Sequence, residues 1–289
     1  MTTKTKGLLA FILLAFGPVW LYEFSAHLFG LSLDNPLVQL PMAFAPAIAA
    51  LITRLWITKE GFSDAGFALH LKRSWPYYLL AWLWSVLVIL VVVGLASLLR
   101  LAPLNFSQLR TLLPGISLPE WVSLLLLMGL AIVMIPVFWG EEFGWRSYLQ
   151  LRLWPRRQLL SALVTGLIWA VWHYPLLFLG YITYANILLG LLSYTCYTVL
   201  LAIMLAWLRL RTASIWPACL AHAGGNMILG TLTGVLLGAL DVAICELLSL
   251  IPLAALCAWI ILKGKFKETR TPDVLMPAAS WKGSDVRSQ

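Results

Sequence analysis

The stretch 121–149, WVSLLLLMGLAIVMIPVFWGEEFGWRSYL, joins an apolar run of membrane-spanning length to a cluster of acidic and basic residues. About 20 consecutive apolar residues cross the hydrocarbon core of a bilayer as a helix. The whole chain of 289 residues has the same character, because 61% of its residues are hydrophobic, 11% are charged and the mean hydropathy is +0.89. Soluble domains carry about 25% charged residues, so the sequence predicts an integral membrane protein.

Apolar windows along the chain predict an all-α fold, a polytopic bundle of about eight transmembrane helices. The predicted spans are residues 7–26, 36–57, 76–99, 120–140, 159–179, 185–207, 216–237 and 242–262. We expect residues 1–262 to form a single transmembrane domain. The basic segment 263–289 begins with Lys263, Lys265 and Lys267 and continues with Pro, Ser and Gly residues. We expect it to be a disordered cytoplasmic tail.

The basic residues predict the orientation of this bundle. When alternate loops are assigned to opposite sides, only Arg100 and Arg110 fall on one side, so 18 of the 20 Lys and Arg residues share the other. The positive-inside rule makes that side cytoplasmic, and both termini are then cytoplasmic. We expect a multi-pass protein of a bacterial inner membrane. The net charge of +8 is explained by loops near anionic lipid headgroups of the bilayer, and no basic patch with interleaved aromatics suggests nucleic acid.

Ionisable residues inside a span cost about 2.5–3.5 kcal/mol at the helix centre, so each one needs a partner or a function. In GEEFGWR, residues 140–146, Glu142 and Arg146 are four apart and share a helical face, where they can form an ion pair. Glu141 points about 100° away from Glu142 and is left for chemistry. The alternative is that the whole cluster is a solvated cap at a helix end.

Two further pairs of polar or aromatic residues lie one helical turn apart within predicted spans. Trp169 precedes His173 in WAVWH, so an indole face can lie against the imidazole. His222 precedes Asn226 in HAGGN, which places imidazole and carboxamide on one face, with two glycines that allow another backbone to approach. Each pair alone is equally consistent with structural hydrogen bonds and small-residue packing between helices.

Together, these residues are the groups required to hydrolyse an amide. A carboxylate and an imidazole can take a proton from water, and further donors can hold the developing oxyanion. The ordered patterns EExxxR, WxxxH and HxxxN resemble the CPBP family of intramembrane proteases, also called the ABI family, which includes the type II CAAX prenyl proteases. The resemblance covers about residues 120–235.

The resemblance implies an intramembrane endopeptidase that acts on a membrane-associated protein or peptide. By this resemblance, Glu141 and His173 would activate the attacking water, and His222 and Asn226 would form the oxyanion site. Glu142 and Arg146 would organise the helix. The family's histidine motif usually begins with Phe, so Trp169, a supporting residue, departs from the pattern.

A zinc ion is an alternative source of the activated water. Glu141, His173 and His222 are of the residue types that hold catalytic zinc, with one position left for water. No HExxH helix is present, and the four cysteines contain no CxxC pair. We favour a glutamate mechanism with no metal or other cofactor.

A second class of function remains open at this point. A non-catalytic membrane protein, such as a bacteriocin-immunity or scaffold factor, or a small transporter, would use the buried polar residues for packing or proton movement. Glu23 and Glu246 lie outside the three motifs, and a transporter would use them as relay acids. Otherwise Glu23 is expected to snorkel at the end of the first helix and Glu246 to bond neighbouring backbone.

Overall fold

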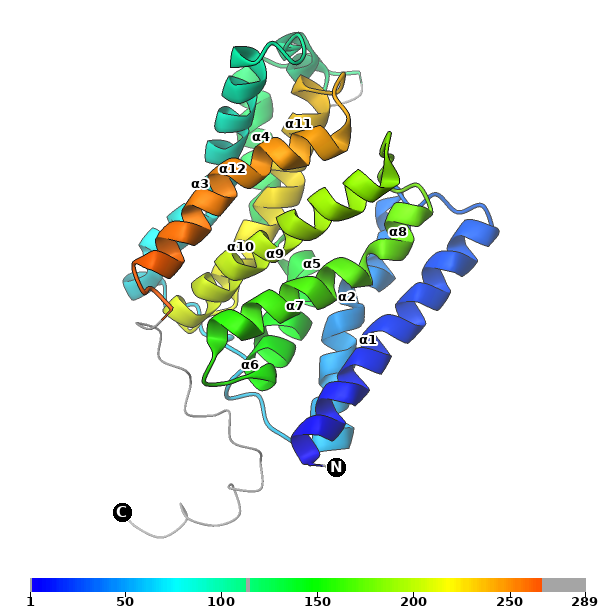
Figure 1. Ribbon diagram of the computed structural model, residues 1–289, viewed down its shortest axis with the longest axis vertical. Helices are drawn as coiled ribbons and strands as arrows, with labels where there is room; N and C mark the ends of the chain where they lie inside the picture. The colour runs from blue at the N-terminus through cyan, green and yellow to red at the C-terminus, as the bar shows by residue number, and fades with distance from the viewer. Residues whose placement is uncertain (1, 113–114, 267–289) are drawn as a thin grey trace.

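The computed structural model describes residues 2–112 and 115–266, and the regular elements of this part of the chain are all helices (Figure 1). They are α1 (Thr3–Leu28), α2 (Pro36–Ile52), η1 (Thr53–Thr58), α3 (Leu71–Leu98), η2 (Phe106–Thr111), α4 (Glu120–Val133), α5 (Ile135–Gly144), η3 (Trp145–Leu149), α6 (Gln150–Leu153), α7 (Gln158–Trp172), α8 (Tyr174–Phe178), α9 (Ile187–Thr212), α10 (Trp216–Gly224), η4 (Gly225–Gly230), α11 (Thr231–Leu236) and α12 (Val242–Leu262). The predicted tail lies outside the described residues, except for a turn over residues 263–266.

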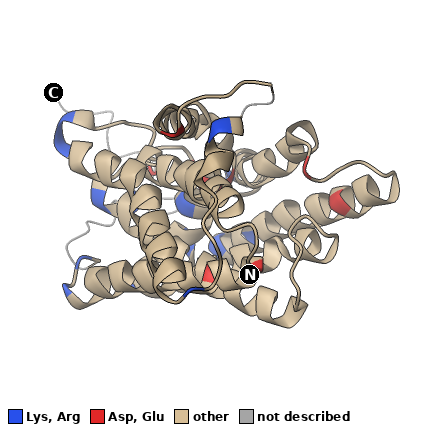
Figure 2. Ribbon diagram, turned by 90° about the horizontal axis from the view of Figure 1, so that it is seen from above, with Lys and Arg blue, Asp and Glu red and all other residues tan. Residues whose placement is uncertain are grey.

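The membrane-spanning helices confirm the predicted all-α bundle. In the described part of the chain, seven helical stretches are long and apolar enough to cross a membrane. The pair Glu120–Val133 and Ile135–Leu153, bent by 48°, is a broken span or a re-entrant loop, and the described residues therefore hold seven or eight candidate spans. Charged residues are sparse along these helices (Figure 2). The chain is therefore an integral, multi-pass membrane protein.

Polar side chains set the starts of three of the long helices. Asn35 precedes α2, and its Oδ1 accepts a hydrogen bond from the Leu37 amide while Pro36 occupies the first helical position. Asn186 and Asp241 cap α9 and α12 in the same way. Such caps satisfy backbone amides that have no partner within the helix, so these polar residues fix where each helix begins.

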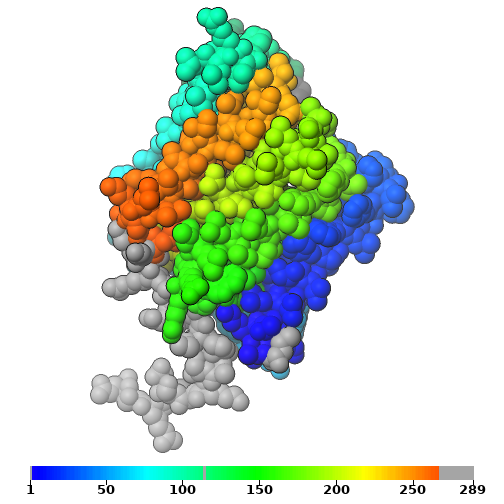
Figure 3. All heavy atoms as spheres, viewed as in Figure 1, coloured from blue at the N-terminus to red at the C-terminus, as the bar shows by residue number. Residues whose placement is uncertain are grey.

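The bundle is held together by helices that lie side by side. Figure 3 shows α12, α9, α7 and α1 in that order across one face of the molecule, and α9 contacts both α7 and α12. Gly166 of α7 allows its close approach to α9, because a Cβ there would lie 2.8 Å from the Cβ of Ala202. Small residues at helix crossings are the usual device for close packing in membranes.

The helix that carries the two adjacent acids is bent and then seated against α2. The bend falls at Met134, directly before α5, where Pro136 occupies one of the first helical positions and cannot donate its amide. A Cβ on Gly140 would collide with the carbonyl of Ala43, and one on Gly144 would lie 2.5 Å from the Cβ of Pro46. These two glycines bracket the acids, so their close contact with α2 fixes the position of α5.

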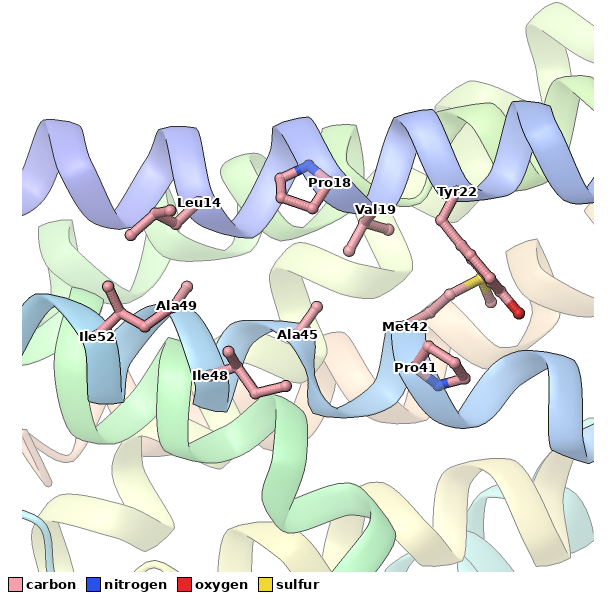
Figure 4. A pocket seen from close by; sticks show the side chains of 10 residues that line it. All are labelled: Leu14, Pro18, Val19, Tyr22, Pro41, Met42, Ala45, Ile48, Ala49 and Ile52. Atoms are coloured by element: carbon pink, nitrogen blue, oxygen red, sulfur yellow. The ribbon is translucent and has the colours of Figure 1, made fainter.

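An apolar groove of about 290 Å³ lies between α1 and α2 (Figure 4). It is lined by Leu14, Pro18, Val19, Tyr22, Pro41, Met42, Ala45, Ile48, Ala49 and Ile52. None of the seven residues singled out by the three sequence motifs is among them. The two adjacent acids lie instead on α5, which packs against α2 through Gly140 and Gly144.

Candidate active site

Glu142 and Arg146 form a buried ion pair within one helical segment. Nε of Arg146 lies 3.0 Å from Oε2 of Glu142, and both side chains are 0% exposed. Glu142 and Arg146 therefore pair as their spacing of four residues predicts. Their contact lacks the alignment of a hydrogen bond. A buried charge without its partner is strongly destabilising, so each of these residues requires the other.

His222, from α10, completes a second contact with Glu142. Its Nδ1 lies 3.1 Å from Oε1 of Glu142, so the two oxygens of this carboxylate face an imidazole and a guanidinium. The imidazole ring also packs against Phe138, with ring centroids 4.6 Å apart. Phe138 and Glu142 are one turn apart on α5, so one face of this helix fixes the orientation of His222.

Glu141 points to a different set of partners. Its Oε2 accepts a hydrogen bond of 2.7 Å from Nε1 of Trp169 and lies 4.0 Å from Nε2 of His173. Nδ1 of His173 is 2.9 Å from the carbonyl oxygen of Trp169. Because a carbonyl oxygen only accepts, Nδ1 carries the hydrogen, and Nε2 of the neutral imidazole presents its lone pair towards Glu141.

The side chain of Asn226 contacts the backbone of His222. The helix changes to π geometry at Gly225, so Asn226 is placed in η4 and not in the regular turn that follows His222. Its side chain is exposed, and its Nδ2 donates to the backbone carbonyl of His222 at 3.3 Å. The two glycines before it face Trp84 and Ser85 of α3, so side chains, not a neighbouring backbone, fill the space there.

Three aromatic residues that were not among the motif residues also contact the site. Phe138 packs on His222, as described above, and its position one turn before Glu142 was a usable signal. Trp172 and Tyr194 contact the ring of His173, with centroids 4.7 and 5.6 Å away. Tyr194 comes from α9, and no local spacing relates it to the three motifs.

The arrangement does not provide a set of zinc ligands. Among the described residues, no group of three or more His, Cys, Asp or Glu side chains is placed to hold a metal ion. Glu141 and His173 face one another, but Nδ1 of His222 faces Glu142.

The two acids outside the motifs have different surroundings. Glu23, on α1, is 0% exposed, and neither of its oxygens has a hydrogen-bond partner in the described structure, so it does not snorkel. Glu246, on α12, accepts hydrogen bonds from Tyr184 at 2.8 Å and Ser193 at 2.5 Å. The partners of Glu246 are thus side chains, whereas the sequence analysis predicts hydrogen bonds to neighbouring backbone groups.

One protein-family model matches the segment of the chain that carries this site. Residues 120–228 match the family described as type II CAAX prenyl endopeptidase, Rce1-like. The matched segment carries all three motifs, and the match supports the resemblance to the CPBP, or CAAX protease, family that these motifs indicate. A search of curated proteins finds no match.

Proposed function

We propose that this protein is an intramembrane endopeptidase that hydrolyses a peptide bond of a membrane-associated protein or peptide. The observation that supports the proposal most directly is the facing pair of Glu141 Oε2 and His173 Nε2, 4.0 Å apart, in a largely buried setting. With hydrogen-bond lengths of about 2.8 Å, one water molecule reaches both atoms. Both atoms are acceptors, so the water donates both hydrogens and keeps its lone pairs for attack.

The proposed reaction begins when Glu141 takes a proton from this water. The water oxygen forms a bond to the carbonyl carbon of the substrate, and the electron pair of the C=O π bond moves onto the carbonyl oxygen. When the tetrahedral intermediate collapses, the C–N bond breaks, and the leaving nitrogen takes the proton from Glu141. His173 holds the water until it attacks. A positioned general base such as Glu141 contributes about 10²–10⁴-fold to the rate.

The oxyanion is assigned to His222, with Asn226 at the edge of the site. Nδ1 of His222 faces Oε1 of Glu142, so the other ring nitrogen, Nε2, is the atom that we assign to the oxyanion. Asn226 bonds the carbonyl of its own helix, and it contributes only after its side chain turns away from that bond. Donors in a site shielded from water are worth more than the same donors in solution.

The substrate class follows from the location of the site. A peptide with an apolar or lipid-modified segment is already concentrated in the bilayer, and the family match is to enzymes of prenylated proteins. A prenylated protein is one possible substrate. We place the protein in a bacterial inner membrane, and there the proposed substrate class is membrane-anchored proteins and peptides in general.

The decisive experiment compares peptide termini in the membrane proteomes of cells that carry the intact protein or the Glu141→Ala or His173→Ala variant. Glu246→Ala is the matched control, because it also removes a glutamate from a membrane helix. We expect termini that depend on Glu141 and His173 but not on Glu246. Termini that persist in both site variants would refute the proposal and favour a scaffold or immunity function, as would a cellular phenotype that survives both substitutions.

Metal dependence is tested separately. We expect a zinc chelator to leave the Glu141-dependent termini unchanged in isolated membranes. Loss of these termini with the chelator and their return with added zinc would replace the proposed glutamate mechanism with a metal-based one.

A further inference from the structure

The side chain of Trp169 contacts both Glu141 and His222. The indole is 3% exposed, and its N–H donates to Oε2 of Glu141 at 2.7 Å. The same ring lies 5.0 Å from the ring of His222, at an interplanar angle of 83°. One residue of α7 therefore contacts Glu141 of α5 and His222 of α10.

A cation covers the face of this indole. Cζ of Arg146 lies 4.8 Å from the centre of the Trp169 ring, within the range of a cation–π contact. The guanidinium draws electron density from the ring, which makes the indole N–H a better donor. Arg146, which pairs with Glu142, thereby also acts on the hydrogen bond to Glu141.

We infer that Trp169 is the positioning residue of Glu141: its indole N–H fixes the orientation of the carboxylate that faces His173. A hydrogen bond to an ionised carboxylate is about twice as strong as one between neutral groups. It occupies one of about four lone-pair sites, so capacity remains for the water between Glu141 and His173. This inference rests on the proposed function of Glu141 as a base.

The backbone of Trp169 serves the same geometry. Its carbonyl oxygen lies 2.9 Å from Nδ1 of His173 and thereby selects the tautomer whose Nε2 accepts. The side chain of Trp169 orients the acid and its carbonyl orients the imidazole, so both partners of the attacking water are set by one residue. A phenylalanine at this position retains the carbonyl and a ring but has no N–H.

The hydrogen bond itself is tested without any substrate, on the purified full-length protein in lipid nanodiscs. Ultraviolet resonance Raman spectra report whether an indole N–H is hydrogen-bonded. We expect Glu141→Ala to shift one tryptophan towards the unbonded signature, and the same substitution to produce no shift in a Trp169→Phe background. The absence of a shift in the first comparison, or its persistence in the second, overturns the inference.

The role in positioning is tested by kinetics on a synthetic peptide that spans a cleavage site found in the termini experiment. We expect Trp169→Phe to lower kcat by about 10²-fold, the effect of a small misplacement of a catalytic group, with KM unchanged. Trp82→Phe is the control, because it removes an indole hydrogen bond to the Met128 carbonyl and should retain kcat. Equal kcat values in the two variants overturn the inference.

The two experiments separate this inference from the proposed function. If no termini depend on Glu141, the proposed function fails. The inference then fails as well, because it requires Glu141 to act as a base. If Glu141-dependent termini are found but Trp169→Phe cleaves like Trp82→Phe, the proposed function stands and the inference alone fails.

Discussion

At the scale of single residues, the two adjacent acids have different tasks because their side chains leave the helix in different directions. Glu142 faces Arg146 and His222 and is 0% exposed. Glu141 faces Trp169 and His173 and retains slight exposure, 8%. The two oxygens of Glu142 thus face a guanidinium and an imidazole at contact distance, whereas the nearest partners of Glu141 are the indole N–H of Trp169 and the lone pair of His173. This asymmetry is the physical basis for assigning the base to Glu141.

The ion pair predicts the outcome of substituting Glu142. In Glu142→Gln, the guanidinium of Arg146 stays buried without its counter-charge, and we expect a loss of about 3–5 kcal/mol of folding free energy. Thermal unfolding in nanodiscs measures this loss. The double variant Glu142→Met with Arg146→Met removes both charges and should regain stability but not activity, because His222 loses its carboxylate. A double variant as unstable as the single one would show that the pair is not the cause.

At the scale of elements, the position of α5 depends on its contact with α2. Gly140 and Gly144 are spaced four residues apart, on the face that meets Ala43 and Pro46, with the acids between them. An interior packed this closely does not accommodate an added methyl group without strain, so a Cβ at either glycine must displace one helix from the other. The acids would then move relative to α7 and α10.

Gly144→Ala tests this coupling against a glycine of the same helical pair. We expect Gly144→Ala to cost about 1–3 kcal/mol through overpacking and to reduce Glu141-dependent cleavage. A Cβ on Gly129 of α4 meets nothing within 4 Å, so Gly129→Ala should be neutral or stabilise by up to about 1 kcal/mol. Thermal unfolding and the termini assay check both variants, and equal effects would mean that the close contact with α2 is unimportant.

The elements also show where reasoning from the sequence is sufficient and where it fails. Hydropathy predicts the bundle and its number of spans, because apolar length alone decides which helices cross a bilayer. The spacing of Glu142 and Arg146 predicts their contact, because both lie in continuous helix. By contrast, the change to π geometry at Gly225, next to Asn226, cannot be seen in local spacing. The hydrogen bond from Trp169 to Glu141 joins residues 28 positions apart, so it depends on tertiary packing.

At the scale of the whole molecule, an ionic network ties together segments at one end of the bundle. Asp64, in the connection before α3, pairs with Arg54 and with Arg152, each at 2.8 Å. Arg54 also donates to the carbonyl of Ser147 at 2.8 Å. The network thus links η1, η3 and α6 across the chain and holds the end of the helix that carries the acids.

The pH dependence of stability follows from Asp64. Burial alone would raise the pKa of this carboxyl, but the charges and hydrogen bonds of Arg152 and Arg54 outweigh it and hold the pKa below its ordinary value of 3.8. A lowered pKa in the folded state contributes stability that is fully present above pH 3.8 and is lost as the pH falls through the folded value. We expect unfolding scans at acidic pH to show this loss, and Asp64→Asn to be less stable at pH 7 and less sensitive to acid. Asp34→Asn, at an exposed site, is the control, and an Asp64→Asn variant that follows it would contradict the role of the network.

The orientation of the bundle is the remaining prediction at this scale. The start of α1, the connection from α6 to α7 and the end of α9 lie at the same end of the molecule (Figure 1), and the basic residues of the sequence predict that this end is cytoplasmic. Ser107 and Arg156 are both exposed and belong to connections on opposite predicted sides. In a variant whose four free cysteines are replaced by serine, a membrane-impermeant maleimide should label Ser107→Cys in intact spheroplasts. It should label Arg156→Cys only after lysis. The reverse pattern would invert the bundle, and a substrate segment would then have to reach Glu141 from outside the cell.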